Sequence, residues 1–363
     1  MSDLAILSIL REAMRLGASD VHIAAGTQAM MRVQGDLLAV PGVPVFDGDS
    51  YIAMISQLLT EPQKEYLQKV WSVNATFGLD TVRYRMNVAY QRQGIEAVFR
   101  VIPNHIPTPE ELRLPPAIVK LAEMDRGLIL VTGPTGSGKS TTLACLLECI
   151  NQTRHDKVIT IEDPIEFVYT SKQSFVSQRE VGQHTPNFAL ALRDILRQDP
   201  DVILVGELRD YETMAAAIQI ADTGHLVLAT LHSSDAPQAV ERIVDVFPHQ
   251  QQQQVRAQLA SILRAVIAQT LLPRLDTRGR VAAFEILMNT PAVASMIRQN
   301  RTHEIHSAME MGSAEGMKSL SRSLTELVKL RIIDPSFLPN SPSLTAARPA
   351  PGPAPLRPRA QGE

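Results

Sequence analysis

The chain has 363 residues, of which 45% are apolar, and a formal net charge of −3 at neutral pH. This length predicts two domains rather than one. No apolar run approaches the ~20 residues that span a bilayer. The acidic opening, residues 1–4, lacks the basic segment of a signal peptide, so we expect a cytoplasmic protein. The charge argues against a dedicated nucleic-acid binder, which normally carries a basic excess.

Residues 1–102 are typical of a small α+β domain. A first helix is predicted from Leu4 to Met14, because apolar residues recur there at helical spacing and Gly17 follows. Short strands are predicted at Val21–Ile23 and Ala29–Val33, with a turn at Gly35 and Asp36.

A β-hairpin is predicted at the end of this domain. From Val82 to Tyr90 apolar and polar residues alternate, and a turn near 91–94 leads to a second strand at Ile95–Ile102. The proline-rich segment that follows is interpreted as a linker, residues 103–113.

Residues 114–334 alternate apolar strands with helices, which predicts an α/β domain with a mainly parallel sheet and helices on both faces. Its predicted strands are Gly127–Thr132, Lys157–Glu162, Asp201–Val205 and His225–Leu231. Its predicted helices are Ser140–Ile150, Phe188–Arg197 and Tyr211–Asp222, and a helical portion is expected from Gln250 to about Arg331. Residues 335–363 hold 8 of the 24 prolines and predict a disordered or polyproline tail.

A phosphate-binding loop lies between the first of these strands and the first of these helices. Strand, glycine-rich loop and helix together form a cradle whose backbone amides point at phosphate oxygens. Lys139 would reach the β- and γ-phosphates of a nucleoside triphosphate and the Ser140 hydroxyl would ligate Mg²⁺. The predicted nucleotide-binding residues are Gly133, Pro134, Thr135, Gly136, Ser137, Gly138, Lys139, Ser140 and Thr141.

Carboxylates follow two of the other strands, at the sheet edge that faces a ligand in parallel sheets. Glu162, Asp163 and Glu166 end the strand at 157–162, although not all three can touch one metal ion. Glu207 follows the strand at 201–205 after Gly206, and we assign it to orienting or deprotonating the attacking water. Glu207 and Glu166 are expected to reach Mg²⁺ through water.

Three further side chains are more ambiguous. His232 ends the fourth strand, where it would either sense the γ-phosphate or simply be hydrogen-bonded. Cys145 and Cys149 lie one helical turn apart with no further metal ligands nearby in sequence, so we expect them to be buried as small apolar residues.

The order of these segments resembles the type II/IV secretion ATPases, and within them most closely the PilT-type pilus retraction motors. The matching segments are residues 133–141, Thr160–Phe167, Gln178–Val181, Asp199–Asp210 and Thr223–His232. The first, second, fourth and fifth of them correspond to the family's Walker A, Asp box, Walker B and His box. The resemblance extends from Gly17 to about Leu330.

The resemblance implies a PAS-like N-terminal domain, a RecA-like ATPase domain and a homohexameric ring. The ring would couple ATP hydrolysis to type IV pilus retraction and twitching motility, peripherally associated with the inner membrane at the pilus base. A platform protein of that membrane would be its partner, and a second retraction ATPase is a further candidate. Arg85 and Arg100 would be arginines aimed at the phosphates across the interdomain cleft.

Two departures define the alternatives. The family's assembly ATPases usually carry a long N-terminal extension and a tetracysteine zinc site, which two cysteines cannot supply. The retraction motors carry a motif like Ala-Ile-Arg-Asn-Leu-Ile-Arg-Glu, whereas residues 292–299 here are AVASMIRQ. The second departure keeps open an accessory, PilU-like ring subunit that assists another motor. A nucleic-acid translocase shares the RecA-like core and is disfavoured by the net charge.

Overall fold

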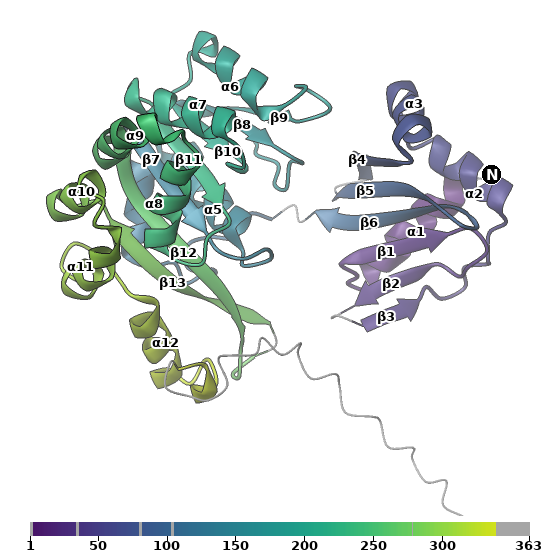
Figure 1. The fold of residues 1–363 in the computed structure, drawn as a ribbon. Coiled ribbons are helices and arrows are strands. Elements are labelled where there is room, and N and C mark those ends of the chain that lie inside the picture. The colour runs from purple at the N-terminus through teal and green to yellow at the C-terminus, as the bar shows by residue number, and fades with distance from the viewer. Residues whose placement is uncertain (1–2, 34–35, 80–81, 103–104, 278, 339–363) are drawn as a thin grey trace, which may run out of the picture.

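The computed structural model describes residues 3–33, 36–79, 82–102, 105–277 and 279–338. They form two parts, each with its own sheet and hydrophobic core (Figure 1). The predicted turn at Gly35, the start of the predicted linker at 103–104 and the proline-rich tail beyond 338 lie outside the described residues.

The N-terminal part is an antiparallel sheet of six strands in the order β3-β2-β1-β6-β5-β4. Helices α1 and α2 contribute to its core. The predicted first helix and hairpin are confirmed as α1 and β5–β6, whereas α2, α3, β3 and β4 were not predicted. Its elements are α1 (Asp3–Arg15), β1 (Asp20–Ala24), β2 (Met30–Val33), β3 (Asp36–Ala39), α2 (Gly48–Ser56), α3 (Glu61–Val70), β4 (Ser72–Leu79), β5 (Val82–Gln91) and β6 (Gly94–Ile102).

Strand β5 has one face in this core and one face outside it. Tyr84, Met86 and Val88 are fully buried, because alternate residues of a strand point to the same side of the sheet. Arg83 and Arg85 therefore lie on the opposite face, which is only partly buried. This alternation is what brings an arginine of the N-terminal part toward the C-terminal part.

The C-terminal part is a sheet of seven strands in the order β13-β12-β7-β11-β10-β8-β9, and only β13 runs antiparallel to its neighbour. The strands are β7 (Gly127–Thr132), β8 (Lys157–Glu162), β9 (Phe175–Glu180), β10 (Val202–Val205), β11 (Leu226–Leu231), β12 (Leu263–Pro273) and β13 (Arg280–Met288). The main helices are α4 (Pro116–Val119), α5 (Lys139–Thr153), α6 (Phe188–Ile195), α7 (Tyr211–Asp222), α8 (Ala236–Asp245), α9 (His249–Ile262), α10 (Pro291–Arg298), α11 (Ile305–Met311) and α12 (Leu320–Lys329).

Helices cover both faces of this sheet, as predicted. Leu128 and Leu130 of β7 pack in the same core as α6–α9, while Ile129 and Val131 pack on the other face against α5. Cys145 is buried in the second of these cores and Cys149 packs partly buried against it. Among the described helices, none combines the length and the apolar character needed to cross a membrane.

The prediction of a helical portion from Gln250 to about Arg331 is wrong over residues 263–288. Strands β12 and β13 interrupt it, and β12 pairs with β7 so that most of its residues are buried. A continuous apolar run predicts a buried strand and a buried helix equally well, which is why periodicity failed there. Pro273 and Gly279, which flank the connection between the two strands, were the available signals of a hairpin.

Candidate nucleotide-binding site

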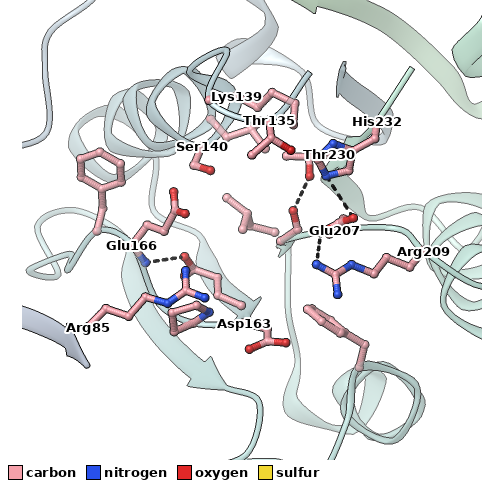
Figure 2. A pocket seen from close by; sticks show the side chains of 18 of the residues that line it. Arg85, Thr135, Lys139, Ser140, Asp163, Glu166, Glu207, Arg209, Thr230 and His232 are labelled. Carbon is pink, nitrogen blue, oxygen red and sulfur yellow. Dashed lines mark hydrogen bonds and ion pairs between the residues drawn. The ribbon is translucent and has the colours of Figure 1, made fainter. Parts of the chain in front are cut away.

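The carboxyl ends of β7, β8, β10 and β11 meet at a cavity of about 280 Å³ between the two parts of the chain. Most of the residues predicted from sequence to do chemistry line it (Figure 2). They are Arg85, Thr135, Gly136, Lys139, Ser140, Glu162, Asp163, Glu166, Glu207 and His232. The other loop residues, Gly133, Pro134, Ser137, Gly138 and Thr141, lie outside this lining.

Lys139 begins helix α5 and is only 8% exposed. Its Nζ donates hydrogen bonds to the carbonyl oxygens of Gly133 at 2.9 Å and Pro134 at 3.1 Å. Burial lowers the pKa of this ammonium group, and the charges of Glu207 and Glu166 partly oppose that change. Within the described residues no salt bridge neutralises Lys139, so a phosphate entering the cavity would meet a cation poorly solvated by water.

The phosphate-binding loop packs directly on strand β12. A Cβ atom on Gly133, whose φ is +141°, would lie 2.3 Å from the carbonyl oxygen of Gln269. One on Gly138 would lie 2.8 Å from Gln269 Nε2, and Gln269 Oε1 accepts a hydrogen bond from Thr142 Oγ1 at 2.8 Å. Gln269 thus supports the loop from behind, a role that sequence reasoning missed because it assigned that segment to a helix.

Glu207 is held on two sides at the carboxyl end of β10. Its Oε2 pairs with Arg209 Nη2 at 2.6 Å, and its Oε1 lies 3.1 Å from His232 Nε2 (Figure 2). Burial would raise the pKa of Glu207, but Arg209 and His232 together lower it below its usual value. Glu207 is therefore a carboxylate with a fixed orientation. Because a lowered pKa makes a carboxylate a weaker proton acceptor, orienting water suits Glu207 better than removing a proton.

The structure gives different environments to Glu162 and Glu166, two of the three carboxylates predicted at the end of the strand at 157–162. Glu162 is buried, and burial raises its pKa to about 7. Hydrogen bonds from Thr160 Oγ1 at 2.7 Å and from the Glu166 amide at 3.4 Å oppose this increase only in part. The Glu166 side chain points into the cavity toward Ser140 (Figure 2). Glu162 thus orders the loop, while Glu166 presents its carboxylate near the phosphate-binding loop.

The two predicted arginines occupy different environments. Arg85 reaches the cavity beside Asp163 and Glu166 (Figure 2). Arg100, whose side chain is 66% exposed, instead donates from Nε to Asp20 Oδ1 at 2.7 Å and lines a neighbouring hollow. Arg85 thus lines both the cavity that Lys139 lines and the neighbouring hollow, whereas Arg100 lines the hollow and not the cavity.

The oxygen ligands in the cavity suit Mg²⁺. In the described part of the chain there is no group of three or more His, Cys, Asp or Glu that would hold a metal ion by themselves. Magnesium in phosphate sites needs only one or two protein oxygens, because waters and phosphate oxygens complete its shell. Ser140 with Glu166 and Glu207 meets that requirement.

Two residues at the site have roles that were not predicted. Arg209 follows Glu207 by two positions and holds its carboxylate, and Thr230 Oγ1 donates to the Gly206 carbonyl oxygen. Both lie inside segments already singled out from sequence. The available signals were that Arg209 is close to Glu207 and Thr230 is close to His232 along the chain. Gly206 itself permits the approach of β10 to β8, since a Cβ there would lie 3.2 Å from the Ile161 carbonyl oxygen.

Comparisons with known proteins identify the family to which this chain belongs. The model of the type II/IV secretion system protein family matches residues 3–331. A twitching motility protein of Neisseria gonorrhoeae is 45% identical over 91% of this chain and 88% of its own length. The type IV pilus retraction ATPase PilT of Pseudomonas aeruginosa is 42% identical over 90% of this chain and 95% of its own.

A solved structure of the pilus retraction motor PilT with bound ADP matches with a TM-score of 0.86 and 43% identity, covering 92% of this chain and 95% of that one. The resemblance and the fold class predicted from sequence are thereby confirmed, including an N-terminal domain followed by a RecA-like ATPase domain. The chain belongs to the type II/IV secretion ATPase family, within which it is similar to PilT.

Proposed function

We propose that this chain is an ATP hydrolase that works as a homohexameric motor of type IV pilus retraction. The observation that carries the proposal is the cavity in which buried Lys139 and two carboxylates are faced by Arg85 from the other domain. Similarity to proteins named for twitching motility and pilus retraction supports the pilus as the machine it serves.

In this proposal the phosphate-binding loop binds ATP, and side chains at the carboxyl ends of the strands catalyse its hydrolysis. Lys139 and the loop amides would hold the β- and γ-phosphates, and Ser140, with Glu166 and Glu207 through water, would hold Mg²⁺. When bound, Mg²⁺ would neutralise charge that develops on the phosphate oxygens. Glu207 orients the attacking water, with His232 beside its carboxylate.

The nucleoside has space next to the loop. A hollow of about 180 Å³ lies behind it, bordered by Gly138, Thr141, Leu271 and Phe284. Because Lys139 and Ser140 line the catalytic cavity and their neighbours Gly138 and Thr141 line this hollow, ATP can extend over the loop from one to the other. We assign the base to this hollow.

Replacing Lys139 by alanine is expected to weaken ATP and ADP affinity by about 10- to 100-fold, since charged hydrogen bonds to phosphate are lost. Titration calorimetry with ADP measures this directly. Lys329→Ala, at the exposed end of α12, removes the same charge far from the cavity and is the matched control. Equal ADP affinity in Lys139→Ala and the control would contradict the assignment.

Partners and location belong to the same proposal. We expect the ring to act on a platform protein of the inner membrane at the pilus base, with a second retraction ATPase as an additional partner. Nucleic acid is not expected as a partner, because the chain carries a net charge of −3 rather than a basic excess. Absence of nucleic-acid-stimulated hydrolysis would agree with this expectation.

Deletion of the gene in its own host tests the pilus assignment. Cells without the protein are expected to keep extended pili that do not retract, and to recover retraction with the intact gene but not with Glu207→Gln. Purified protein is expected to hydrolyse ATP without other proteins. Normal retraction after deletion would contradict the proposal.

One observation favours an accessory ring subunit as the second candidate. Helix α10 keeps Val293 and Ile297 buried, yet residue 294, where the retraction motors carry arginine, is a buried alanine. If this helix couples hydrolysis to movement, the chain would assist another motor rather than retract pili alone. Pilus retraction lost only when a second ATPase is also deleted would favour this candidate.

A further inference from the structure

The end of strand β9 makes polar contacts with both domains. Glu180, the last residue of β9, is only 3% exposed. It belongs to the 178–181 segment, to which none of the catalytic roles above is assigned. We propose that Thr76, Glu180 and Gln183 form an interdomain latch that positions Arg85 against the loop at 163–166. The inference rests on the proposed ATPase function and adds positioning residues to it.

On the C-terminal side, Glu180 fixes the catalytic loop. Its Oε2 accepts a hydrogen bond from the Ile165 amide at 3.2 Å, so the carboxylate holds the loop midway between Asp163 and Glu166. The Glu180 amide donates to His184 Nδ1 at 2.9 Å, and Gln183 Nε2 donates to Glu180 Oε1. These contacts orient the carboxylate from its own strand and turn.

On the N-terminal side, one hydroxyl meets this carboxylate. Thr76 Oγ1 of β4 donates to Glu180 Oε1 at 3.3 Å and accepts from Gln183 Nε2 at 2.8 Å. Thr76 is also the cross-strand partner of Arg85 in the β4–β5 ladder. The strand pair that carries Arg85 is therefore joined through one carboxylate to the loop that carries Glu166.

The surroundings indicate that these hydrogen bonds, rather than close packing, define the domain contact at this point. A cavity of about 690 Å³ lies beside the latch, between residues of α3 and β4 and the turn after β9. Arg85 and Asp163 line both this cavity and the catalytic one. A small displacement of the domains would move Arg85 within this space unless the latch restrains it.

Thr76→Val removes the hydroxyl and keeps the shape of the side chain. We expect it to lower the rate of single-turnover ATP hydrolysis by about 3- to 10-fold without changing ADP affinity, the size of effect that one hydrogen bond supports. Thr76→Ser, which keeps the hydroxyl, is the matched control and is expected to retain the rate. In an Arg85→Ala background, Thr76→Val is expected to have no further effect, because the latch acts through that arginine.

A second measurement does not depend on hydrolysis. In the ADP-bound protein, amide hydrogen exchange over residues 163–167 is expected to be faster in Thr76→Val and unchanged in Thr76→Ser, because Glu180 loses a restraint. Full additivity of Thr76→Val with Arg85→Ala, or unchanged rate and exchange in Thr76→Val, would overturn the latch. Failure of the wild-type protein to hydrolyse ATP would instead overturn the proposed function, while the exchange comparison would still test the latch.

Discussion

Glu207→Gln is expected to bind ATP with unchanged affinity and to lose about 10²- to 10³-fold in turnover. The substitution keeps the size of the side chain but removes the negative charge that Arg209 and His232 hold in place. A neutral amide can still accept from Arg209, so we expect the fold to be retained. What is lost is the charge available to orient water and to attract the magnesium hydration shell.

Steady-state phosphate release together with ADP titration separates the two effects. The matched control is Glu212→Gln, which makes the same change at an exposed position in the first turn of α7. Wild-type turnover in folded Glu207→Gln protein would remove Glu207 from the mechanism. The next carboxylate to test would then be Glu166, which points into the same cavity.

Arg85→Ala is expected to reduce turnover by about 10³-fold with ADP affinity little changed, because an arginine directed at a transferring phosphoryl group stabilises charge that develops only in the transition state. Arg85 is the arginine of the N-terminal domain that lines the catalytic cavity. Single-turnover hydrolysis with excess enzyme measures the chemical step and makes a loss of this size visible.

Arg100→Ala provides an internal comparison on the neighbouring strand. Arg100 sits opposite Arg85 in the β5–β6 ladder, but its guanidinium is paired with Asp20. We therefore expect a loss of less than about 10-fold, mainly from the unpaired, largely buried Asp20. Equal losses for the two variants would show that the arginines act together, as the family resemblance implies, and would contradict the separation that the structure makes.

The local part of the site was predictable from sequence, because its chemistry is concentrated in short segments. The loop at 133–141 and the carboxylates after β8 and β10 each follow a recognisable buried strand, and parallel strands end at one edge of the sheet. The alternation of β5 also predicted which of its residues face the core. It did not predict what the other face contacts, and only the family resemblance directed Arg85 toward the phosphates.

The parts that could not be predicted depend on contacts between distant segments. Glu180 and Thr76 are 104 positions apart and meet only because the two domains lie against each other. Gln269, which supports the phosphate-binding loop, lies 127 positions after its hydrogen-bond partner Thr142. Sequence periodicity describes one element at a time, so neither contact leaves a local signal.

The two faces of β5 have a consequence for insertions and deletions. Loss of one residue at the start of this strand would turn every following side chain to the opposite face. Tyr84 and Met86, now in the N-terminal core, would point toward the nucleotide, and Arg85 would point into a core whose described members are hydrophobic. A substitution on this strand therefore affects one of its faces, whereas a change in its length exchanges the core and the catalytic surface together.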